Sequence, residues 1–79
     1  MRVTVVCFGA MREHLPPETT GNRAELDAPA SATVGDVIDL LGAPRRLVFA
    51  VLVDGVQADL GRKVSEGAEV TLMPPFTGG

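Results

Sequence analysis

The chain of 79 residues contains no tryptophan or tyrosine, and only one cysteine, one histidine and one lysine. A single cysteine, Cys7, cannot form an internal disulfide and offers no metal-ligand spacing with a second one. No run approaches the roughly 20 apolar residues that cross a bilayer. The apolar residues 3–10 lie between Arg2 and Arg12 and do not resemble a signal peptide. We therefore expect a cytoplasmic protein that binds neither metal nor membrane.

Groups that catalyse reactions are equally scarce. No serine or cysteine is placed by the sequence to act as a nucleophile beside His14, the only histidine. The register of the first apolar segment points Cys7 toward the core, although a surface register would make it a candidate redox thiol. The only lysine, Lys63, does not follow a glycine-rich phosphate loop. The sequence therefore predicts no catalytic site within the body of the chain.

Positive charge is also in short supply, because ten acidic residues give the chain a formal net charge of −3. Nucleic-acid-binding proteins carry basic patches. Here the only basic cluster contains four residues, and the acidic residues offset it; its members are Arg45, Arg46, Arg62 and Lys63. We expect no nucleic-acid partner.

What the chain does contain is β-branched sequence near its start. Residues 2–8 alternate with a period of two, which predicts a strand whose odd-numbered residues face the core. Val6 and Phe8 would then form exposed apolar surface on the other face. Residues 9–15 predict a short helical turn, and the weaker alternation of residues 23–28 predicts a second strand that pairs with the first.

The clearest element is a helix at Val34–Leu41. Thr33 can cap its N-terminus, and Asp36, three residues further on, can complete a capping box. Gly42 provides the residue that commonly ends a helix. The apolar residues recur at i, i+3, i+4 and i+7, which predicts one buried stripe that contains Val34, Val37, Ile38 and Leu41.

The second half of the chain predicts three more strands. Residues 47–53 are almost continuously apolar and favour a central strand, which the tight-turn pair Asp54 and Gly55 would end. Residues 56–60 and 68–73 predict the last two strands. This order, β-β-α-β-β-β, indicates an α+β roll in which one main helix packs across a mixed sheet of four to five strands. The first and last strands can lie side by side at its centre. We assign residues 1–73 to this domain.

Residues 74–79 differ from an ordinary polar terminus. Pro74 and Pro75 hold the backbone extended and block further sheet pairing, so six residues can reach about 20 Å. Gly78 and Gly79 have no side chains, so a terminal carboxylate could enter a narrow channel. An inert flexible tail is the alternative interpretation. The residues that we expect to contact a partner are Phe8, Met73, Pro74, Pro75, Phe76 and Thr77.

Three segments resemble one known family. The ending Leu-Met-Pro-Pro-Phe-Thr-Gly-Gly at 72–79 resembles the hydrophobic-PPxxGG terminus of MoaD/ThiS ubiquitin-like sulfur carriers, and is most similar to that of MoaD, the small subunit of molybdopterin synthase. Residues 8–13 are similar to the family segment F-A-x-L-R-E, and residues 66–70 resemble its DGDEV segment. Two features depart from the pattern: the connection from the helix to Leu47 is short, and Asp54 stands where many members have Asn.

The resemblance implies a β-grasp (ubiquitin-like) fold and a sulfur carrier that is not an enzyme in itself. An E1-like adenylyltransferase of the MoeB or ThiF type would use ATP to adenylate the carboxylate of Gly79. A sulfurtransferase would then supply sulfur, typically as a persulfide, which would displace AMP and leave a thiocarboxylate. Gly79 would carry the sulfur, Gly78 would give access, and the chain would bind no cofactor. A large molybdopterin synthase subunit of the MoaE type would hold the sulfur acceptor.

Other functions remain open on the same residues. The chain could carry sulfur for thiamine or another sulfur-containing metabolite, through another acceptor enzyme. It could instead be a ubiquitin-like modifier that forms an isopeptide bond through Gly79. A third possibility is a β-grasp interaction module whose tail is inert.

Overall fold

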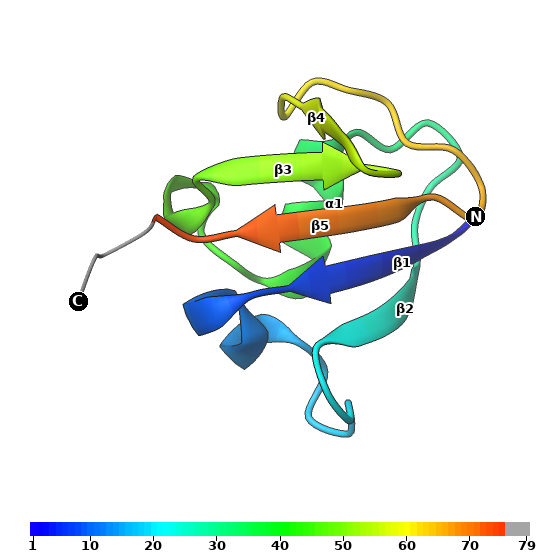
Figure 1. Cartoon of the computed structure of the whole chain (residues 1–79). Coiled ribbons are helices and arrows are strands. Elements are labelled where there is room, and N and C mark those ends of the chain that lie inside the picture. Colours follow the sequence, from blue (N-terminus) through cyan, green and yellow to red (C-terminus); the bar gives the residue numbers. More distant parts are fainter. Residues whose placement is uncertain (76–79) are drawn as a thin grey trace.

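A computed structural model describes residues 1–75, in which five strands, one α-helix and two short 3-10 helices follow one another (Figure 1). This succession confirms the predicted β-β-α-β-β-β order. The elements are β1 (Arg2–Cys7), η1 (Gly9–His14), β2 (Arg23–Asp27), α1 (Val34–Leu41), η2 (Arg45–Leu47), β3 (Ala50–Val53), β4 (Val56–Ala58) and β5 (Glu69–Met73).

The five strands form one mixed sheet in the order β2-β1-β5-β3-β4. The first and last strands pair in parallel at its centre, as predicted, and the remaining neighbours are antiparallel. Because β1 and β5 are parallel, they end at the same edge of the sheet. Figure 1 shows both strands pointing toward the side where η1 and η2 lie, away from the N-terminus.

The helix α1 has the predicted bounds because residues at each end cap it locally. The Asp36 N–H donates to Thr33 Oγ1 at 3.2 Å, and the Thr33 N–H donates to Asp36 Oδ2 at 2.9 Å. This is the predicted capping box. At the other end Gly42 has φ 77°, the left-handed conformation that glycine adopts most readily.

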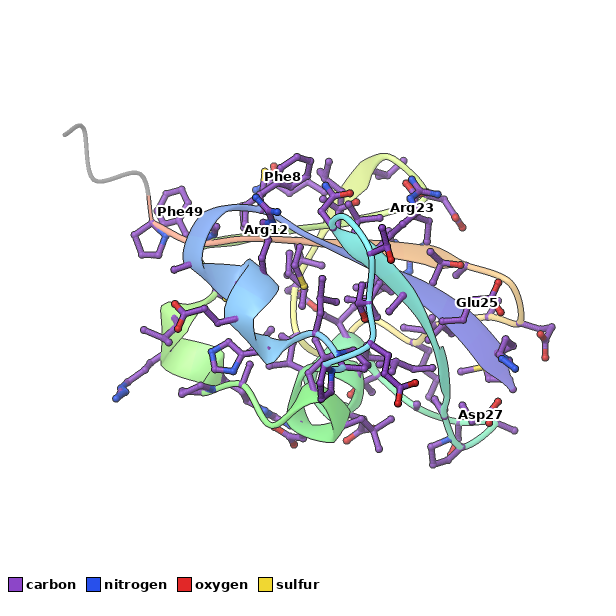
Figure 2. All side chains as sticks on the ribbon, turned by 90° about the horizontal axis from the view of Figure 1, so that it is seen from below. Phe8, Arg12, Arg23, Glu25, Asp27 and Phe49 are labelled. Atoms are coloured by element: carbon purple, nitrogen blue, oxygen red, sulfur yellow. The ribbon has the colours of Figure 1, made fainter. Side chains whose placement is uncertain are left out.

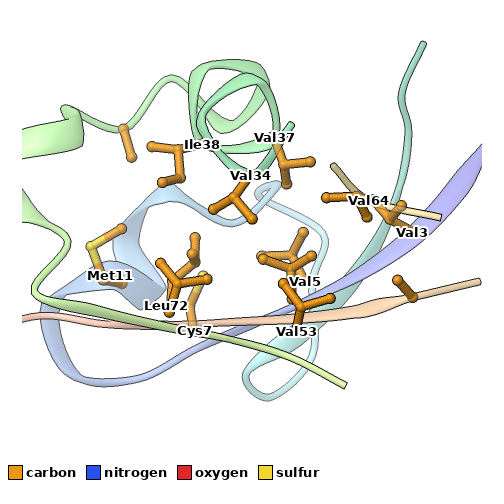
Figure 3. Close-up of a cluster of buried hydrophobic side chains, with 14 of the residues drawn as sticks. Val3, Val5, Cys7, Met11, Val34, Val37, Ile38, Val53, Val64 and Leu72 are labelled. Carbon is orange, nitrogen blue, oxygen red and sulfur yellow. The ribbon is translucent and has the colours of Figure 1, made fainter. Parts of the chain in front are cut away.

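The core lies between α1 and the sheet (Figure 3). The odd-numbered residues of β1 are buried as predicted, as are Val70 and Leu72 of β5. The helix contributes Val34, Val37 and Ile38, whereas Leu41 at the end of the stripe is only partly buried. Burial raises the pKa of the Cys7 thiol. Cys7 is therefore a core residue, and the alternative of a reactive surface thiol does not apply.

Two strand predictions were too long by two residues or more, and the burial predicted for Leu47, Phe49 and Val6 was wrong. The strand predicted at residues 47–53 begins at Ala50, and the strand predicted at 56–60 ends at Ala58. Ala50 pairs with Met73, the last residue of β5. Pro74 and Pro75 follow and have no N–H to donate, so β5 cannot extend to pair with the residues before Ala50. The apolar residues 47–49 therefore stand outside the sheet.

Val6 does not belong to an exposed apolar surface, because only 5% of it is accessible. It lies on the sheet face opposite α1, where its neighbours are Arg23 of β2 and Thr71 of β5. An ion pair between Arg23 and Glu69, 3.1 Å from nitrogen to oxygen, joins the strands on either side of β1 on this face. Alternation along one strand predicts which face a residue occupies, but not what the neighbouring strands place beside it.

Residues 1–75 include no helix that is long and apolar enough to span a membrane.

Candidate docking site at the base of the tail

Two phenylalanines flank the end of β5. Phe8 follows the last residue of β1, which is parallel to β5, and its N–H donates to the Leu72 carbonyl at 3.1 Å. Phe49 precedes the first residue of β3, which is antiparallel to β5, and its N–H donates to the Met73 carbonyl at 2.8 Å. The strand directions thus bring two residues 41 positions apart to opposite sides of the point where the tail begins.

Both rings are exposed, with 46% of Phe8 and 74% of Phe49 accessible to solvent. An apolar groove lies around them, and we call it the tail-base groove. No residue in its lining carries a titratable side chain. The lining consists of residues 8–11, Leu47, Phe49, Ala50, Met73, Pro74 and Pro75. Exposed apolar surface on a small protein commonly marks a site of protein–protein contact.

Gly9 allows Pro74 to lie against the body of the protein. Its φ is +55°, a conformation that residues with a side chain rarely adopt. A Cβ at this position would sit 3.0 Å from Cγ of Pro74, closer than ordinary van der Waals contact. Pro74 therefore packs over a backbone position that has no side chain.

The structure unites some of the predicted partner-binding residues. Phe8, Met73, Pro74 and Pro75 line one groove. Val6, which we expected beside them, is buried elsewhere. The remaining predicted site residues lie outside the described residues; these are Phe76, Thr77, Gly78 and Gly79.

Sequence reasoning missed Leu47 and Phe49, because it assigned both to a buried strand. A signal was present: the apolar run at 47–53 is longer than the part of it that can pair with a strand ending at a proline pair. Leu47 is 38% exposed and belongs to η2, which starts after Pro44.

The arrangement suits binding rather than catalysis. The groove offers no acid, base or nucleophile, and the Cys7 thiol lies in the core with a raised pKa. Within residues 1–75, no three His, Cys, Asp or Glu side chains are grouped so that they could hold a metal ion.

Comparison with known proteins gives one family and a consistent fold. The profile of the ThiS family matches residues 8–79. The crystal structure of SAMP1 from Haloferax volcanii has 28% sequence identity and a TM-score of 0.76, and each chain covers 100% of the other. No curated protein matches the chain.

Two more distant structures share the fold. A putative molybdopterin converting factor subunit 1 from Pyrococcus furiosus is 18% identical with a TM-score of 0.70, covering 95% of this chain and 98% of its own. A chain in a complex of subunits 1 and 2 of the molybdopterin-converting factor from Helicobacter pylori is 21% identical, with a TM-score of 0.63. The match covers 100% of this chain and 100% of that chain. The five-stranded mixed sheet with one main helix is thus a β-grasp, ubiquitin-like fold, as predicted.

Proposed function

We propose that this chain, which belongs to the ThiS family, is a sulfur carrier that is activated at Gly79 and docks its partners on the tail-base groove. The observation that carries the proposal is the position of the groove. Phe8 and Phe49 flank the residue at which the tail begins, so an enzyme that covers the groove also receives the tail. Docking would hold the reacting carboxylate near the partner's catalytic groups, which is the main contribution of positioning to such reactions.

The chemistry begins at the carboxylate of Gly79. An activating enzyme joins this carboxylate to the α-phosphate of ATP, and pyrophosphate leaves. The terminal sulfur of a persulfide then attacks the acyl carbon, and AMP leaves. A thiol finally takes the donor's inner sulfur as a disulfide, and the outer sulfur remains on Gly79 as a thiocarboxylate. Gly78 and Gly79 place no side chain beside these reacting atoms.

Molybdopterin synthesis is the pathway that we propose first for this sulfur. The tail carries the Pro-Pro pair that resembles MoaD termini. The Helicobacter pylori structure is a complex of two molybdopterin-converting factor subunits, and its first subunit has the same fold as this chain. We propose a large subunit of the MoaE type as the acceptor enzyme. Thiamine synthesis is the alternative, since the matching profile is that of the ThiS family.

The intact mass of the protein tests the carrier proposal. We would incubate the chain with ATP, an activating enzyme of the MoeB or ThiF type and a persulfide-loaded sulfurtransferase. The expected product is heavier than the chain by the difference between sulfur and oxygen, with the change located at Gly79. Gly79→Ala should fold normally and gain no sulfur. A wild-type terminus that stays a carboxylate with enzymes that activate another carrier would contradict the proposal.

A matched pair of variants tests the docking part. Phe49→Ala removes an exposed ring of the groove, whereas Leu40→Ala removes an exposed side chain, 50% accessible, from α1. Phe49→Ala should slow sulfur loading about fivefold or more, because truncation of a residue at the centre of an interface can cost more than about 1 kcal/mol. Leu40→Ala should load at the wild-type rate. Equal loading by the two variants would place docking elsewhere.

A second candidate function is protein modification. The similarity to SAMP1 over the whole chain favours it, because the Haloferax volcanii protein is described as a small archaeal modifier protein. The same adenylated Gly79 would then react with a lysine amine and form an isopeptide bond. Conjugates that survive reducing denaturing gels, and that Gly79→Ala abolishes, would support this function. A thiocarboxylate without conjugates would support the carrier function and contradict the modifier function.

A further inference from the structure

The cations next to the tail-base groove have no ion-pair partner among residues 1–75. Arg12 follows Met11 of the groove, and Arg46 precedes Leu47. Both arginines are exposed, and neither takes part in the ion pairs of the described chain. Arg45 differs from them, because it donates to Asp39 through Nε at 3.1 Å and through Nη2 at 2.9 Å.

Acidic residues gather at the opposite end of the sheet. Asp27 pairs in register with Arg2 at the start of β1, and Glu69 lies beside Thr4 at the start of β5. Glu66 accepts the Arg2 N–H, and Glu25 forms an ion pair with the Arg2 side chain. In Figure 2, Phe8, Arg12 and Phe49 lie toward the end where the tail leaves, and Glu25 and Asp27 lie toward the other end.

We propose that the tail-base groove recognises a protein segment in which apolar side chains are flanked by carboxylates, with Arg12 and Arg46 facing those carboxylates. The proposal rests on the proposed function and names the chemistry of its partner. A chain with a net charge of −3 repels an acidic partner over most of its surface. Arg12 and Arg46, which form no ion pair within residues 1–75, outnumber the exposed acid Glu13 that follows Arg12, and leave this end as the favoured approach. This would orient the encounter as well as strengthen it.

An anionic membrane would also offer apolar groups flanked by negative charge, but the charge of the chain argues against a membrane. Membrane-binding patches usually gather four to eight basic residues, with about 1 kcal/mol for each of them. Only Arg12 and Arg46 stand unpaired beside the groove within residues 1–75, and the acidic chain as a whole is repelled by anionic lipid. A protein partner with a few carboxylates fits this charge better.

Two amphiphilic probes of similar chain length separate headgroup recognition from apolar binding. We would titrate the ¹⁵N-labelled protein with sodium decanoate and with decyltrimethylammonium, both below their micelle concentrations. Both should shift the amides of Phe8, Phe49 and Met73. Decanoate carries one carboxylate and should bind up to about fivefold more tightly, the range expected for one exposed ion pair.

Charge reversal supplies the matched test. The double variant Arg12→Glu and Arg46→Glu should lose or invert the preference for decanoate. Arg62→Glu with Lys63→Glu changes the charge equally but lies near the N-terminal end of α1, where the Val34 N–H donates to the Arg62 carbonyl. This control should keep the preference. Phe49→Ala should weaken both probes together. Should the first double variant unfold, Arg12→Gln with Arg46→Gln removes the charge without adding acids, and should abolish the preference.

Equal binding of the two probes by the wild type, or equal loss of preference in both double variants, would overturn the inference. So would binding to phosphatidylserine vesicles that the Arg12 and Arg46 variant abolishes, because the occupant would then be a membrane. Sulfur loading is measured separately. Normal loading without a headgroup preference would contradict this inference alone, and a preference without loading would contradict the sulfur carrier alone.

Discussion

Gly9 is the residue whose missing side chain makes room for Pro74. Alanine at this position would have to adopt a φ of +55° and would place its Cβ 3.0 Å from Pro74. At Gly21 the φ is +80°, but nothing lies within 4 Å of an added Cβ. The two glycines therefore separate backbone strain from contact with the tail.

We expect Gly9→Ala and Gly21→Ala each to lower the free energy of unfolding by about 1–2 kcal/mol, the cost of a left-handed conformation for a residue with a side chain. Only Gly9→Ala should also move Pro74, shift the amide resonances of Met73 and Phe49, and slow sulfur loading. Urea denaturation and NMR spectra of the two variants check this. Identical spectra around Met73 would show that Pro74 does not depend on Gly9.

Asp36 makes the stability of the first turn of α1 depend on pH. The hydrogen bond from the backbone of Thr33, followed by the bond from its side chain, lowers the pKa of this carboxyl from its ordinary value of 3.8. A lowered pKa in the folded state means that the ionised form stabilises the fold above the ordinary value. That stabilisation is lost as the pH falls through the folded-state pKa.

Asp36→Asn should therefore destabilise the protein at neutral pH, and the difference from the wild type should shrink as the pH falls below 3.8. Urea midpoints at neutral pH and at about pH 3 measure this. Glu18→Gln, at an exposed carboxylate without a hydrogen bond to the described residues, removes the same charge away from the cap and serves as control. A constant difference between Asp36→Asn and the wild type at all pH values would contradict the capping role.

At the scale of the element, the burial of each apolar residue of α1 determines how much unfolding free energy its truncation costs. Ile38 is fully buried between the helix and the sheet, whereas Leu41 at the C-terminal end of the helix is partly exposed. Ile38→Ala should cost about 2–5 kcal/mol of unfolding free energy, the usual range for deleting buried aliphatic groups. Leu41→Ala should cost less. Denaturant unfolding decides between them, and equal costs would mean that the helix is rotated relative to the sheet.

The strands show how far local sequence could predict an element. The capping residues and Gly42 determine α1 from its own sequence, so its bounds were predicted correctly. The start of β3 depends on a distant strand. Its first residue, Ala50, pairs with Met73, the last residue of β5 before Pro74. Residues 47–49 are as apolar as the strand that follows them, so composition alone could not place that limit.

At the scale of the whole molecule, the order of the strands predicts where stability resides. The central strands β1 and β5 pair on both sides, while β2 and β4 each pair on one side only. The hydrogen-bonded amides of β1 and β5 should exchange with solvent only through global unfolding, and those of the three-residue strand β4 should exchange fastest within the sheet. Hydrogen exchange followed by NMR tests this ranking, which equal protection of β4 and β5 would contradict.

The sequence by itself determined the order of elements, the bounds of α1 and the unusual tail, because these depend on residues close together in the chain. A cap requires four residues, a tight turn two, and the tail motif eight. Its resemblance to sulfur carriers pointed to the family that the profile then gave. Phe8, Met73 and the two prolines were predicted to contact a partner, and they line one groove in the structure.

Only the tertiary structure decided that Phe49 and Phe8 lie on opposite sides of the end of β5, that Val6 is buried, and that Leu47 and Met11, the neighbours of Arg46 and Arg12, line one groove. The physical reason is common to all three. Each depends on which strands pair and in which direction, and pairing joins residues that are far apart in sequence. A parallel β1 and an antiparallel β3 bring the end of one strand and the start of another to the base of the tail.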